Sequence, residues 1–108
     1  MIRTVLLAAS VLACTSSSSS TGITAADLSC PSDSTLSYAN FGSTFLTDHC
    51  LSCHASGQQP NLATQAAVKA ARAAIINVAV TSSAMPPGGS VSVDERELLG
   101  EWLTCGAP

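Results

Sequence analysis

Apolar and polar positions follow a helical pattern most clearly near the C-terminus. Four large apolar residues recur there at helical spacing and form one stripe: Leu98, Leu99, Trp102 and Leu103. Ser92 can cap this helix at its start, and Glu95, three residues later, completes the sequence pattern of a capping box. Gly106 can end the helix and is followed by Pro108. The pattern therefore predicts a last helix that begins after Ser92 and buries its stripe in the core.

Two earlier stretches predict further helices. A first helix is expected from about Tyr38 to Cys50, and a middle helix from near Leu62 or Ala63 to near Val78. The middle stretch is rich in alanine, which favours a helix, whereas the β-branched residues near its end favour fraying. No sheet is evident in the pattern. The sequence therefore predicts an all-α fold.

The first thirteen residues have the pattern of an export signal. Arg3 supplies the basic start, an apolar run follows from Val5 to Leu12, and small residues surround a possible cleavage point. The run is much shorter than the roughly 18 residues that a membrane-spanning helix needs. We interpret residues 1–13 as a signal peptide that is removed on export.

The cleavage point Val11-Leu12-Ala13-Cys14 resembles that of a bacterial lipoprotein signal. In that family the cysteine becomes the first mature residue and carries the lipid, which implies lipidation of Cys14. Ordinary signal cleavage after Ala13 is the alternative. The following Ser-rich tract has no apolar residue to pack, so residues 14–29 are expected to form a flexible tether. Its r.m.s. span would be roughly 20 Å. Residues 30–108 would then form one folded domain.

Composition narrows the classes of function. Apolar residues make up 46% of the 108 and charged residues 10%, which argues against a disordered chain. Four Lys and Arg against seven Asp and Glu leave no basic patch for nucleic acid. The aromatic side chains are few for a core of this size: Tyr38, Phe41, Phe45 and Trp102. Five cysteines indicate an oxidising compartment, a metal or a covalent cofactor.

The strongest motif is Cys50-Leu51-Ser52-Cys53-His54. Two thiols at this spacing can each form a thioether with a vinyl group of haem, and His54 can then bind the iron as an axial ligand. Three other interpretations are weaker. A thioredoxin-like redox pair needs flanking strands, and a structural zinc site needs a second pair of ligands. A disulfide between Cys50 and Cys53 would be strained on a helix.

Met85 is the candidate for the second axial ligand. Its thioether is a soft ligand for iron, and the two prolines and two glycines that follow it predict a rigid, non-helical loop. The alternative is a core methionine that fills a gap. His49 is the rival ligand, but it immediately precedes Cys50 on the His54 side and has poor reach to the opposite face. We interpret His49 as a partly exposed neighbour of the haem edge.

From about residue 37 to residue 105 the chain resembles the class I cytochromes c, which carry one haem. The resemblance implies an orthogonal bundle of helices around one covalent haem c. Gly42 stands where that family keeps a small residue so that the first and last helices cross closely, and Trp102 would pack against this crossing. The apolar face of the first helix would come from Phe41, Phe45 and Leu46. The haem would supply much of the core that the few aromatic residues leave unfilled.

The resemblance also implies roles for the segment Gln59-Pro60-Asn61-Leu62, which is similar to the family's Gly-Pro-x-Leu. The Pro60 carbonyl would accept a hydrogen bond from Nδ1–H of His54, and Leu62 would pack on the haem. Gln59 departs from the family's glycine. With Cys50 and Cys53 on the haem and lipid on Cys14, Cys30 and Cys105 are expected to form a disulfide, since they flank the first and last helices.

By this resemblance the chain is an electron carrier rather than an enzyme, with His54 and Met85 holding the iron. It would be exported to the bacterial cell envelope, face the periplasm or the exterior, and be anchored to a membrane by lipid. Its partners would be a redox donor and a redox acceptor. We expect a monomer that does not bind nucleic acid. Alternatives are an open-haem peroxidase or gas sensor, a haem subunit of a larger oxidoreductase, and a lipoprotein without haem.

Overall fold

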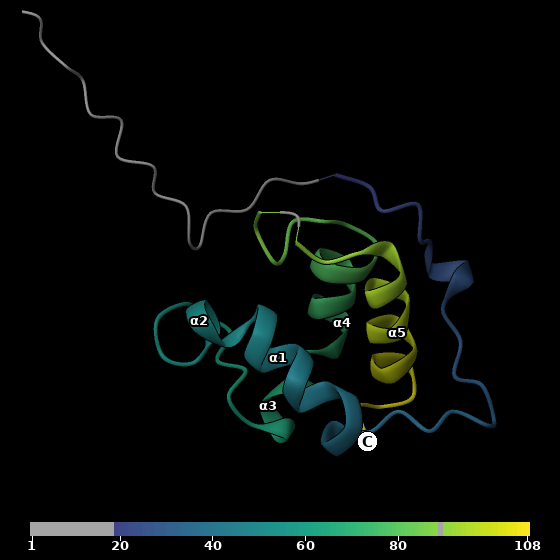
Figure 1. Cartoon of the computed structure of the whole chain (residues 1–108), viewed down its shortest axis with the longest axis horizontal. Coiled ribbons are helices and arrows are strands. Elements are labelled where there is room, and N and C mark those ends of the chain that lie inside the picture. Colours follow the sequence, from purple (N-terminus) through teal and green to yellow (C-terminus); the bar gives the residue numbers. More distant parts are fainter. Residues whose placement is uncertain (1–18, 89) are drawn as a thin grey trace, which may run out of the picture.

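A computed structural model describes residues 19–88 and 90–108 of the chain (Figure 1). The described residues form helices and contain no β-strand, which confirms the predicted all-α fold; an isolated bridge joins Ser20 to Ser82. None of these helices is long and apolar enough to cross a membrane. In chain order the elements are η1 (Ala25–Asp27), η2 (Tyr38–Gly42), α1 (Ser43–His49), α2 (Leu51–His54), α3 (Gln65–Ala70), α4 (Arg72–Ile75), η3 (Ile76–Val80) and α5 (Val93–Thr104).

The predicted first helix is present but begins with a wider turn. The π-helical turn η2 runs directly into α1, and the backbone departs from helical geometry at Cys50 before α2 begins. Ser37 caps this assembly, because its side chain accepts a hydrogen bond from the Asn40 amide at 3.1 Å. The Cys50 carbonyl accepts from the amide of His54 at 2.9 Å. The motif Cys50-Leu51-Ser52-Cys53-His54 therefore lies on one short helical turn directly after α1.

The middle helix differs from its prediction at both ends and in its centre. It begins at Gln65, where Thr64 caps it, and not near Leu62. At Ala71 the backbone leaves helical geometry (φ −97°, ψ 8°), so that α3 and α4 are separate elements. The helical run then continues through η3 to Val80, two residues beyond the expected end.

The last helix, α5, confirms its prediction in detail. The Ser92 side chain accepts from the Glu95 amide at 3.1 Å, and the Glu95 carboxylate accepts from the Ser92 amide, which completes the capping box. The chain turns after the helix at Gly106, whose φ of +98° suits glycine. One residue of the predicted stripe is wrong: Leu98 is 44% exposed. Leu98 and its buried neighbour Leu99 are 100° apart on the helix, so both cannot point into the same core.

The first and last helices meet where Gly42 faces Trp102. A Cβ atom added at Gly42 would overlap the indole ring of Trp102, so the approach needs a residue without a side chain. Tyr38 and Phe41 also pack on this indole, with ring centroids at 6.4 and 6.0 Å. The C-terminus closes the same region, since the Pro108 carbonyl accepts from the Trp102 indole N–H at 3.2 Å (Figure 1). The predicted contact between Gly42 and Trp102 is confirmed.

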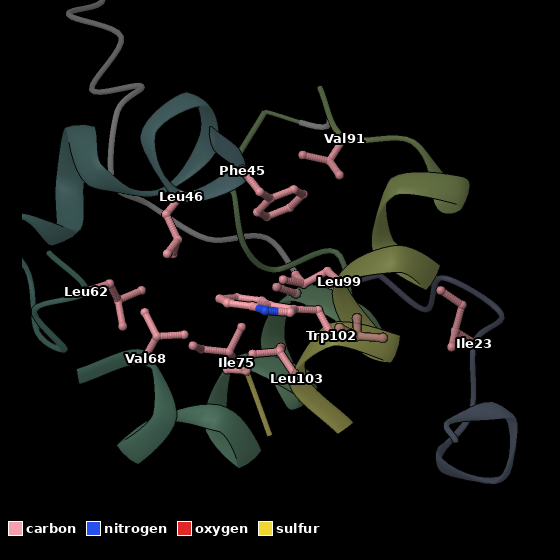
Figure 2. Close-up of a cluster of buried hydrophobic side chains, with 13 residues drawn as sticks. Ile23, Phe45, Leu46, Leu62, Val68, Ile75, Val91, Leu99, Trp102 and Leu103 are labelled. Carbon is pink, nitrogen blue, oxygen red and sulfur yellow. The ribbon is translucent and has the colours of Figure 1, made fainter. Parts of the chain in front are cut away.

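The buried side chains form one cluster that extends from α1 across α3 and α4 to α5. Figure 2 shows the Trp102 ring near the middle of this cluster, with Ile23 at its edge. The members are Ile23, Phe45, Leu46, Leu62, Val68, Ile75, Ala79, Val80, Val91, Leu99, Trp102, Leu103 and Ala107. Phe45 and Trp102 are the aromatic members, so the core is otherwise aliphatic.

Cys30 and Cys105 form the predicted disulfide. Their Cα atoms are 4.9 Å apart, and the bond links positions 75 residues apart in the sequence. It ties the segment before the first helix to the end of α5. A cross-link that closes so long a loop restricts the unfolded chain strongly.

The segment before Cys30 lies against the domain, which differs from the tether predicted over residues 14–29. The Ser83 amide donates to the Ser19 carbonyl at 2.8 Å, and the Thr21 hydroxyl donates to the Val80 carbonyl at 2.6 Å. Ile23 is 6% exposed. Polar composition predicted a free chain here, but these hydrogen bonds and one buried isoleucine attach residues 19–23 to the domain. The signal peptide and Cys14 lie outside the described residues.

Candidate functional site

One cavity collects every residue for which the sequence predicted a role in holding the cofactor. Its volume is about 420 Å³, within the usual range for small-molecule and cofactor sites. It lies between α2 and the loop that follows it, the α4–η3 helix, and the loop after η3. Its lining includes Cys50, Cys53, His54, Pro60, Leu62 and Met85. These positions span 36 residues of sequence, so the fold brings separate segments together.

The His54 imidazole is fixed by the segment that the resemblance singled out. Its Nδ1 lies 2.8 Å from the Pro60 carbonyl oxygen. Because a carbonyl can only accept, Nδ1 carries the hydrogen, and in the neutral imidazole Nε2 then has the lone pair. The Leu62 amide in turn donates to the His54 carbonyl at 2.7 Å. The hydrogen bond expected between His54 and Pro60 is therefore present, and it leaves one ring nitrogen able to bind a metal.

The two motif cysteines are in different chemical states. Cys50 is a free thiol, and burial raises its pKa to about 11. Cys53 is disulfide-bonded in the structure, and its partner is not Cys50. A disulfide within the motif, one of the alternatives for this sequence, is therefore not formed. Both sulfurs line the cavity.

Met85 enters the cavity from the loop after η3. Its side chain is partly buried against the core. Its backbone is held at both polar atoms: the amide donates to the Val78 carbonyl at 2.7 Å, and the carbonyl accepts from Arg96 at 2.7 Å. Pro86, which follows directly, is buried. The loop thus has a defined position where Met85 lines the cavity.

His49, the rival ligand, also lines the cavity but has other contacts. Its ring packs on Phe45 with centroids 4.8 Å apart, and its Nε2 lies 3.9 Å from a carboxylate oxygen of Glu95. The side chain is 20% exposed. The structure therefore places His49 as a partly exposed residue beside Cys50.

The walls of the cavity are largely apolar and uncharged. Ile75 and Ala79 are buried, whereas Val78 is 38% exposed although it belongs to the same wall. Among the described residues of the lining, Asp48 is the one with a fixed charge. An apolar group in this cavity would cover Val78 and would meet one charged side chain, the exposed Asp48.

Sequence analysis missed Arg96, the charged residue most closely tied to this site. It is 2% exposed, and its guanidinium donates to the Met85 carbonyl. A sequence signal did exist, because Arg96 lies three, four and seven positions before Leu99, Gly100 and Leu103 and so shares their buried face.

No group of three or more His, Cys, Asp or Glu side chains among residues 19–88 and 90–108 is arranged to hold a metal ion. Haem iron needs only two protein ligands, since the porphyrin supplies four nitrogens, and His54 and Met85, which both line the cavity, carry donor atoms of the kind that haem iron binds. The apolar walls and the two sulfurs also suit haem. In comparisons with known proteins, no family model, curated protein or solved structure matches this chain.

Proposed function

We propose that this chain is a monohaem c-type cytochrome, an electron carrier with a cytochrome c-like bundle of helices. One observation supports it above all: the six residues that the motif and the resemblance select line a single cavity of about 420 Å³. The cavity has apolar walls, a hydrogen-bonded histidine and a methionine. A bound haem would supply one-electron chemistry, with its iron cycling between Fe(III) and Fe(II).

Cys50 and Cys53 would hold the cofactor covalently. Each thiol would add across a vinyl C=C, so that its sulfur bonds to one carbon and its hydrogen goes to the other, with no change in the number of electrons. Both sulfurs must be reduced for this addition, so the Cys53 disulfide and a thioether are alternative states of the same atom. The partly buried Cys50 thiol is poorly reactive in the closed fold, because a raised pKa keeps it protonated. Attachment therefore belongs to the reduced chain before it closes.

His54 and Met85 would be the axial ligands. The Pro60 carbonyl fixes the tautomer and direction of the His54 ring, which leaves Nε2 free to bind and makes it a stronger donor. The Met85 thioether is a soft, neutral ligand that favours the reduced iron and raises the potential. With both axial positions filled there is no open site for a substrate, which favours electron transfer over catalysis.

The site of action would be the bacterial cell envelope. The proposal includes export, a lipid on Cys14 and a monomeric domain that exchanges electrons with a redox donor and a redox acceptor. It is supported by the signal-like residues 1–13 and by the cysteine content, which suits an oxidising compartment. Mass spectrometry of the mature protein tests the anchor, because a lipid on Cys14 adds a defined mass to the N-terminal peptide.

The central test is an absorption spectrum of the full chain produced with haem-maturation machinery, oxidised and then reduced, before and after carbon monoxide. We expect haem that resists extraction by acidic acetone, a weak far-red sulfur-to-iron band in the oxidised form, and no response to carbon monoxide. Met85→Ala should abolish the far-red band and admit carbon monoxide. Covalent haem that binds carbon monoxide readily in the wild-type chain would favour the open-haem alternative. Absence of covalent haem would refute the proposal.

A further inference from the structure

Arg96 is a buried cation without a carboxylate partner among the residues that the structure describes. It is 2% exposed, and no salt bridge to it is formed there. Burial lowers the pKa of its guanidinium, an effect that nearby Glu95 opposes. A buried charge is costly unless hydrogen bonds satisfy it. What satisfies Arg96 therefore indicates why the fold retains it.

Its hydrogen bonds all go to one segment of backbone. Nη1 of Arg96 lies 2.7 Å from the carbonyl oxygens of Ala79 and Met85, and 3.5 Å from that of Ser82. The guanidinium thus links Ala79, near the end of η3, to Met85 in the loop that follows. A further hydrogen bond joins the same two segments, since the Met85 amide donates to the Val78 carbonyl at 2.7 Å.

These contacts hold the loop at the point where its position matters most. Residues 81–88 form no regular helix, and Gly88 among them has a φ of +99°. A thioether is a weak ligand, so its occupancy of a metal depends on how little freedom it loses on binding. Because the Met85 carbonyl is held in place, the position of the Met85 Cα atom, from which the side chain extends, is restricted as well.

We propose that Arg96 is a positioning residue that keeps the Met85 sulfur in the cavity as an axial ligand. The inference rests on the proposed function, since it assigns Arg96 a role toward the ligand of that same site. The guanidinium suits the task because its plane fixes the directions of the two N–H bonds of Nη1, the nitrogen that makes these contacts. Lysine would keep the charge, but its three N–H donors rotate on a flexible stem and have no fixed direction. Methionine would fill the space without any donor.

The test compares Arg96→Met, Arg96→Lys and a matched control in the haem-loaded full chain. The control is Leu103→Ala, which removes a buried side chain of the same helix that makes none of these hydrogen bonds. For each variant we would measure the far-red band, the reduction potential, carbon monoxide binding and the thermal midpoint. All spectra are recorded well below the lowest midpoint, so that only folded protein is compared.

We expect Arg96→Met to keep its covalent haem, lose most of the far-red band, lower the potential and bind carbon monoxide at least ten times faster. Arg96→Lys should show the same changes in smaller degree. Leu103→Ala should lose thermal stability and keep the wild-type band and potential. This combination separates a role toward Met85 from a general contribution to stability.

Three results would overturn the inference alone. They are an unchanged band in Arg96→Met, an equal loss of band in Leu103→Ala, and failure of both Arg96 variants to fold, which would make Arg96 a support of the whole domain. A wild-type chain without covalent haem, or with haem but no sulfur band, would instead overturn the ligand role of Met85 and this inference with it.

Discussion

At the helix crossing, Gly42 and Trp102 fit by shape, whereas in the loop that carries Met85 the chain is held by one buried guanidinium. The crossing is made by apolar contacts, a disulfide and helix caps, all of which resist unfolding. The loop depends on backbone carbonyls that accept hydrogen bonds from Arg96. The crossing is therefore the scaffold of the domain, and the loop is an attachment to that scaffold. Substitutions at the crossing should therefore lower the stability of the domain, whereas substitutions that release the loop should change the far-red band.

The largest expected effect comes from filling the crossing. Gly42→Val places a branched side chain where Trp102 lies, and we expect a loss of about 3 kcal/mol in the free energy of unfolding. Thermal unfolding followed by circular dichroism measures it. Gly57→Ala is the matched control, since a Cβ atom there would meet only the Cys53 carbonyl, at 3.5 Å. Equal stability of the two variants would contradict the close fit at Gly42.

Removal of the disulfide should be next in size. Replacing Cys30 and Cys105 together by serine frees a loop closed over 75 residues, and we expect a loss of about 2–3 kcal/mol, because the packed helices already restrain the chain. The midpoint of denaturant unfolding measures it. The far-red band of the folded, haem-loaded variant should be unchanged. A change in that band would mean that scaffold and loop are not separate.

The reactivity of Cys50 tests how tightly the cavity closes without haem. At pH 8, a pKa of about 11 leaves roughly 100-fold less thiolate than a cysteine with a pKa of 9.0 has, so alkylation of the folded, haem-free chain should be slower by about two orders of magnitude. Because burial raises this pKa, the contribution to stability is present below about pH 9 and is lost as pH rises toward 11. Peptide mapping after timed alkylation measures the rate, and the same chain in denaturant is the reference. Equal rates in the two would show that Cys50 is accessible.

The smallest expected effect lies at the junction of loop and scaffold. Ser92→Ala removes the cap of α5, and we expect a loss of about 1 kcal/mol. Thr104→Ala near the other end of the helix is the control, because the structure shows no hydrogen bond from its side chain. Thermal unfolding of the two variants measures the difference. If Ser92→Ala also weakens the far-red band, the start of α5 helps to place the loop.

The parts of the fold that the sequence predicted well depend on local rules. The bounds of α5 follow from Ser92, Glu95 and Gly106, which act within one turn of the helix end. The contact of Gly42 with Trp102 and the disulfide followed from the resemblance rather than from the pattern. Six of the residues that line the cavity were also selected in advance, although the sequence could not show that they meet.

The errors arise where tertiary contacts override local preference. Nothing local breaks a helix at Ala71, yet α3 and α4 separate there. Arg96 was missed because arginine is rarely buried, and its acceptors lie on a loop 11–17 residues earlier. The Ser-rich composition concealed the hydrogen bonds that attach Ser19 and Thr21 to the domain.

The hydrogen bond between Ser83 and Ser19 would shorten the free chain between a lipid on Cys14 and the folded domain. Between Cys14 and Ser19 lie five Cα–Cα steps, which extend at most about 18 Å. With a lipid on Cys14, as proposed, the domain would be held at the bilayer surface and would meet its partners by diffusion in the plane of the membrane. Ser19 accepts a hydrogen bond from Ser83, two residues before Met85. The point at which the anchored segment joins the domain therefore lies beside the loop that carries the Met85 sulfur. A partner that rises only a short way from the same membrane would meet that side of the molecule first.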